Sequence, residues 1–76
     1  MILAQPMPKT RTVEMTCLRS QLDRLTDALN AAAYVVDYWT DAEGRGQRVR
    51  VEILALDEPA TDTTIRNRIR IAAGLL

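Results

Sequence analysis

Residues 15–29 read MTCLRSQLDRLTDAL, and their apolar side chains recur alternately three and four positions apart. An α-helix turns once in about 3.6 residues, so this spacing puts one apolar stripe on a helix. The stripe consists of Met15, Leu18, Leu22, Leu25 and Leu29. We therefore predict an amphipathic helix that begins at a capping threonine, Thr10 or Thr12, and ends near Leu29.

The segment after this helix predicts a β-hairpin. Residues 33–40 read AYVVDYWT and are rich in aromatic and β-branched types, which fit a pleated sheet better than a helix. Residues 48–53 alternate polar and apolar at period two, and the intervening residues 41–47 contain two glycines. In such a strand Tyr34, Val36 and Tyr38 share one face, and Val35, Asp37 and Trp39 share the other.

The last segment predicts a second helix. Pro59 ends the hairpin because it cannot donate to a ladder, and Thr61 or Asp62 caps the helix that follows. Its apolar stripe consists of Ile65, Ile69, Ala72 and Leu76. The same stretch also alternates with Arg66, Arg68 and Arg70, so a third strand is the alternative.

The fold class that follows is a small α+β domain with the order helix, β-hairpin, helix (αββα). The alternative is an all-α helical hairpin with coiled-coil-like packing, because the heptad pattern continues through Ala32, Val36 and Trp39. Pro6 and Pro8 favour an extended backbone at the start of the chain. We therefore expect residues 1–10 to form a flexible N-terminal arm and residues 11–76 to form a single small domain.

The composition argues against several functional classes. The 76 residues include no histidine and one cysteine, Cys17, so the commonest general base and zinc ligand is missing and no intrachain disulfide can form. We predict a non-enzymatic protein with no catalytic residues, no cofactor and no metal. No apolar run approaches the ~20 residues of a membrane span, so we expect no membrane association, a cytoplasmic location and a reduced thiol.

The aromatic residues and two arginines are the candidate partner-binding residues. Tyr34, Tyr38 and Trp39 are the only aromatics and lie within six positions. Arg66 and Arg70 lie four apart on one face of the last helix, at the edge of its apolar stripe. Tyr, Trp and Arg dominate binding hot spots. A small domain without disulfide or metal also gains stability from association. We therefore predict a protein–protein interaction module: a homodimer or other homo-oligomer, an assembly subunit, or an inhibitor of a larger protein.

Two alternatives remain open. Arg45, Arg48 and Arg50 in the hairpin, together with the arginines of the last helix, suit a nucleic-acid-binding accessory factor. Ten basic residues balance ten acidic ones, however, which argues against strong attraction to phosphates. The predicted order of elements is similar to that of phage head-to-tail joining proteins, so the second alternative is a structural joint in a phage-type assembly.

Overall fold

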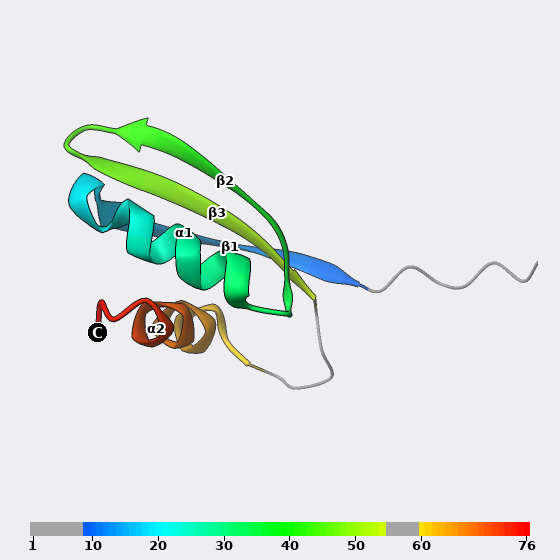
Figure 1. Ribbon diagram of the computed structural model, residues 1–76. Coiled ribbons are helices and arrows are strands. Elements are labelled where there is room, and N and C mark those ends of the chain that lie inside the picture. Colours follow the sequence, from blue (N-terminus) through cyan, green and yellow to red (C-terminus); the bar gives the residue numbers. More distant parts are fainter. Residues whose placement is uncertain (1–8, 55–59) are drawn as a thin grey trace, which may run out of the picture.

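A three-stranded antiparallel sheet carries two helices on one of its faces (Figure 1). The structure is a computed structural model and describes residues 9–54 and 60–76. Along the chain the elements are β1 (Thr10–Leu18), a 3-10 turn (Arg19–Gln21), α1 (Leu22–Ala31), β2 (Val35–Glu43), β3 (Gly46–Leu54) and α2 (Asp62–Ala72). The strand order is β1-β3-β2. The α+β class is thereby confirmed, and the all-α alternative is wrong.

The first half of the predicted first helix is a strand, so the predicted order αββα is wrong and the observed order is βαββα. In β1 the side chains of Val13 and Met15 are buried, whereas those of Thr12, Glu14 and Thr16 are exposed. This is the period-two alternation of a half-buried strand, and it is reinforced by three β-branched threonines. Met15 and Leu18 fitted the helical spacing only by coincidence.

The second half of that helix is confirmed, because α1 covers Leu22 to Ala31 and buries Leu25 and Leu29. It ends where Ala32 takes an extended backbone conformation, so it does not continue toward Trp39. Leu18, which lies on the predicted stripe, is 58% exposed. Of the predicted flexible arm, residues 1–8 lie outside the described residues, and Thr10 already belongs to β1.

The predicted hairpin is confirmed, with β2 paired to β3, but its turn is shorter than the predicted 41–47 and contains only Gly44 and Arg45. Gly44 has φ +58°, a left-handed conformation that glycine adopts at little cost. Tyr38 lies on one side of β2 and Asp37 and Trp39 lie on the other, as predicted. The predicted faces of Val35 and Val36 are wrong, because the register shifts between Val35 and Asp37. This bulge makes Val36 the extra residue. As a result, Val35 and Tyr38 pack against the core while Trp39 lies on the opposite face.

The predicted last helix is confirmed as α2, and the strand alternative for this segment is wrong. Of its predicted stripe, Ile65 and Ile69 are buried, whereas Ala72 is exposed and Leu76 lies beyond the helix. Thr61 is the N-cap residue, and its hydroxyl accepts a hydrogen bond from the Thr64 N–H at 3.2 Å. The start of α2 is also held to the start of β1: Arg11 donates to the Ala60 carbonyl and lies 3.5 Å from an Asp62 carboxylate oxygen. These contacts place α2 beside β1.

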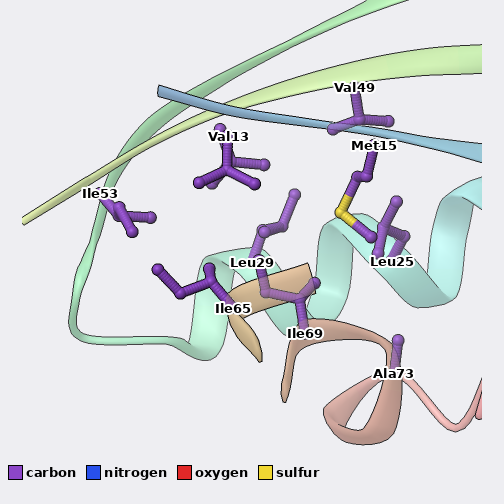
Figure 2. Packing of buried hydrophobic residues seen from close by; sticks show 10 residues of the cluster. Val13, Met15, Leu25, Leu29, Val49, Ile53, Ile65, Ile69 and Ala73 are labelled. Carbon is purple, nitrogen blue, oxygen red and sulfur yellow. The ribbon is translucent and has the colours of Figure 1, made fainter. Parts of the chain in front are cut away.

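The core lies between the sheet and the two helices (Figure 2). It contains inward residues of β1 and β3 and the apolar stripes of α1 and α2: Val13, Met15, Leu25, Leu29, Val49, Val51, Ile53, Ile65, Ile69 and Ala73. Tyr34, Val35 and Tyr38 pack at its border. Because both helices cover the same face, the other face of the sheet is left open within the described part of the chain (Figure 1).

Candidate protein-interaction surfaces

The uncovered side of the sheet, which we call the open face, follows directly from the strand register. Its residues alternate with the buried valines and face away from both helices. They form rows across β1, β3 and β2: Thr12–Glu52–Asp37, Glu14–Arg50–Trp39 and Thr16–Arg48–Asp41, with Glu43 beyond the last row. Five carboxylates against two guanidinium groups give the open face a net charge of −3.

Most of these charges form an ion-pair ladder. Arg48 donates two hydrogen bonds to Glu43, at 3.0 and 2.7 Å, and these bonds raise the pKa of the Arg48 guanidinium. Arg50 lies 3.6 Å from Asp41 and 4.0 Å from Glu14. The groups are solvent-exposed, and such pairs contribute little to stability. The ladder therefore mainly makes this face polar and acidic.

One row of the open face is not compensated. Asp37 and Glu52 lie directly opposite one another on neighbouring strands, and such strands are about 4.8 Å apart. Within residues 9–54 and 60–76, neither carboxylate has a cationic group within 4.0 Å. Asp37 accepts a hydrogen bond only from the neighbouring Tyr38 N–H, at 2.8 Å. Like charges placed opposite each other on neighbouring strands are destabilising. A cation bound between Asp37 and Glu52 would therefore reduce the repulsion between the two carboxylates.

The three predicted aromatic residues do not form one patch. Tyr34 and Tyr38 are partly buried at the border of the core, and the Tyr38 hydroxyl donates to the Asn30 side chain at 2.9 Å. Trp39 is 47% exposed on the open face, opposite Arg50. With Thr12 and Arg50 it lines a hollow of about 300 Å³. Of the aromatics, Trp39 is the one exposed for a partner.

The two predicted arginines lie on the flank of α2 that faces β1, next to the edge of the open face. Arg66 donates to the Glu14 carbonyl at 3.2 Å and to the Thr63 hydroxyl at 3.2 Å. Among the described residues, no carboxylate lies within 4.0 Å of Arg70. Both arginines border a hollow of about 510 Å³ along β1, whose remaining lining residues are Glu14, Met15, Thr16, Glu43 and Arg48.

The contact of Arg66 with the backbone gives it a structural role. We expect Arg66→Ala to lower the free energy of unfolding by about 0.5–1.5 kcal/mol, the net worth of an ordinary hydrogen bond. Urea denaturation measures this change. Arg24→Ala on the exposed surface of α1 is the control and should leave stability within about 0.5 kcal/mol. Equal stability of the two variants would contradict the structural role.

The outer surface of α2, which we call the helix face, was not singled out by the sequence. It consists of residues that point away from the buried Ile65 and Ile69, namely Thr64, Asn67, Arg68 and Ile71, together with Arg70 at its border with β1. Ile71 is 62% exposed, and with Thr64, Asn67 and Arg68 it lines a hollow of about 350 Å³. Three arginines against Asp62 give α2 a net charge of +2.

The chain contains a single thiol, that of Cys17. Cys17 is partly buried beside the core, and this burial raises the pKa of its thiol, which lowers its nucleophilicity at neutral pH. In the described part of the chain, no three side chains of His, Cys, Asp or Glu gather closely enough to hold a metal ion. Neither of the two helices described here has the length and apolar character needed to cross a membrane.

Comparisons with known proteins identify no relative. No family model, no curated protein and no solved structure matches this chain. The analogy with phage joining proteins rested on the order helix, strand, strand, helix, and the observed order is different.

Proposed function

We propose that this chain is a non-enzymatic protein–protein interaction module of the cytoplasm, which binds its partner through the open face around Trp39. The observation that carries the proposal is a half-exposed tryptophan on a sheet face that no described helix covers. Tryptophan is the residue type most enriched in binding hot spots, because a large flat ring loses much water-exposed area on contact.

The charge of the open face supports a protein partner over a nucleic acid. A net charge of −3 around Trp39 repels phosphates, whereas nucleic-acid-binding surfaces are strongly positive. The uncompensated carboxylates of Asp37 and Glu52 instead suit a partner that supplies an arginine or lysine. A complementary charge of this kind mainly sets specificity and the rate of association.

A photo-crosslinking experiment tests the proposal. A photoreactive phenylalanine analogue replaces Trp39 in the full chain, and the variant is illuminated in an extract of the source organism. We expect a protein adduct, identified by mass spectrometry, that excess wild-type chain suppresses and that excess Trp39→Ala chain does not. The same analogue at Arg24, on the exposed surface of α1, is the control. Adducts only with nucleic acid, or none above the Arg24 control, would overturn the proposal.

A further inference from the structure

We propose that the partner of the open face is the helix face of a second copy of this chain, bound head to tail. This inference rests on the proposed function and names the partner. Ile71 of one copy packs against Trp39 of the next, and the arginines beside Ile71 meet the carboxylates beside Trp39. Both apolar side chains are about half or more exposed in the single chain, at 62% and 47%.

The charges of the two surfaces are complementary. The open face carries −3 and α2 carries +2, although the whole chain is neutral. Open face against open face would oppose five carboxylates with five, and helix face against helix face would oppose arginines with arginines. Both symmetric contacts are repulsive, so the charge distribution favours the asymmetric contact.

The spacing of the charges also agrees. Asp37 and Asp41 flank Trp39 on the same side of β2, and four residues of strand span about 13 Å. Arg68 and Arg70 leave opposite flanks of α2 on either side of Ile71, and a helix with its side chains is about 10–12 Å across. Two arginines can therefore straddle the contact and reach the two aspartates.

The uncompensated row gives the contact a further source of energy. An arginine from the helix face can bind between Asp37 and Glu52, which have no cation of their own in the described part of the chain. Arg70 likewise makes no ion pair within 4.0 Å there, although Glu14 and Glu43 border the same hollow. Each group gains its first opposite charge in the contact, without breaking the existing ladder of Arg48 and Arg50.

The placement of the two surfaces decides the kind of assembly. Trp39 on the open face and Ile71 on the helix face both point away from the core, from opposite layers of the fold, so the sheet and the core lie between them. One chain therefore cannot bring its own Ile71 into contact with its own Trp39. Arg70 lies nearer to the open face, because it borders the same hollow as Glu14 and Glu43. When the open face of one copy binds the helix face of another, one copy keeps an unbound helix face and the other keeps an unbound open face. Further copies therefore bind until the assembly closes into a ring or grows as an open stack.

A mixing experiment with the full chain tests this inference by light scattering after size-exclusion chromatography. One variant, Trp39→Ser, can no longer bind through the open face but keeps the helix face. A second variant, Arg68→Glu with Arg70→Glu, can no longer bind through the helix face but keeps the open face. We expect the wild type to form species larger than a dimer that grow with concentration and shrink at high salt. Each variant alone should associate at least about 30-fold more weakly, the loss typical of a hot spot. Their equimolar mixture should form dimers and stop there.

The controls make every outcome decisive. Circular dichroism must show that each variant keeps the wild-type fold, which the exposure of Trp39 and Arg68 and the partial exposure of Arg70 favour. Should Trp39→Ser fail to fold, Asp37→Arg with Glu52→Arg replaces it. Arg24→Glu reverses a charge away from both faces and should associate like the wild type. A wild type that stays monomeric at every concentration, or a mixture that stays monomeric, would overturn the head-to-tail contact. A Trp39 adduct with a different protein in the crosslinking experiment would then still support the proposed function.

Discussion

Leu25→Ala should lower the free energy of unfolding by about 2–5 kcal/mol, the cost of removing a buried leucine side chain and leaving a cavity. Leu25 is fully buried between the sheet and α2. A domain of this size has only about 4–11 kcal/mol of stability in total, so the variant should be close to unfolding at ordinary temperatures. A thermal or urea denaturation curve measures the loss.

Leu18→Ala is the matched control, since Leu18 lies on the same sequence stripe but is 58% exposed in β1. Its unfolding free energy should change by no more than about 0.5 kcal/mol. If the whole stripe belonged to one helix, both substitutions would be costly. Similar losses in the two variants would therefore contradict the boundary between β1 and α1.

Val13→Asp should destabilise the domain by at least about 3–5 kcal/mol, because it places a carboxylate without a partner in the core. Val13 is completely buried on the inner side of β1, opposite Val51. We expect the purified variant to lack the cooperative unfolding transition of the wild type. Far-ultraviolet circular dichroism during heating provides the measurement.

Thr16→Asp is the control for this substitution, because Thr16 points to the open face and lies opposite Arg48. The added carboxylate is solvated and close to a guanidinium group, so stability should change by no more than about 0.5 kcal/mol. On a helix with the predicted stripe, Val13 would lie on the solvent side and tolerate the change. A stable, cooperatively folded Val13→Asp variant would thus restore the helical interpretation.

The elements that the sequence predicted well are those with a strong local signal. The hairpin has a two-residue glycine turn between alternating strands, and α2 has a threonine cap before a stripe of isoleucines. The α1 stripe was also visible at Leu25 and Leu29. In each case the residues that specify the element lie close together in the sequence, so a local sequence pattern is enough to predict it.

The misassigned segment shows why local patterns can fail. Met15 and Leu18 extend the spacing of Leu22 and Leu25, so a helical pattern overlapped a strand pattern formed by Val13, Met15 and Cys17. What makes residues 10–18 a strand is pairing with β3, whose paired residues lie 28 to 44 positions later in the chain, too far apart for a local sequence pattern to show. Tertiary context outweighs local propensity in such segments.

The candidate surfaces were harder to predict for the same reason. Clustering along the chain suggested one aromatic patch, but Tyr38 and Trp39 are consecutive residues of β2 and therefore point to opposite faces of the sheet. The acidic character of the open face was present in the alternation of Asp37, Trp39, Asp41 and Glu43. The acidic face could be recognised only once the pairing of β2 with β3 was known, because this pairing places Glu52 opposite Asp37.

The strand order β1-β3-β2 also has a consequence for the order of events in folding. β2 and β3 are joined by a two-residue turn, whereas Thr10 pairs with Leu54, 44 positions later in the chain. Closing a short loop costs less chain entropy than closing a long one. The β2–β3 hairpin can therefore form first, and β1 pairs with β3 afterwards. During synthesis, β1 leaves the ribosome first and stays unpaired until β3 has followed. Its inner side, with Val13 and Met15, is then open to chaperones or to β3 of another copy.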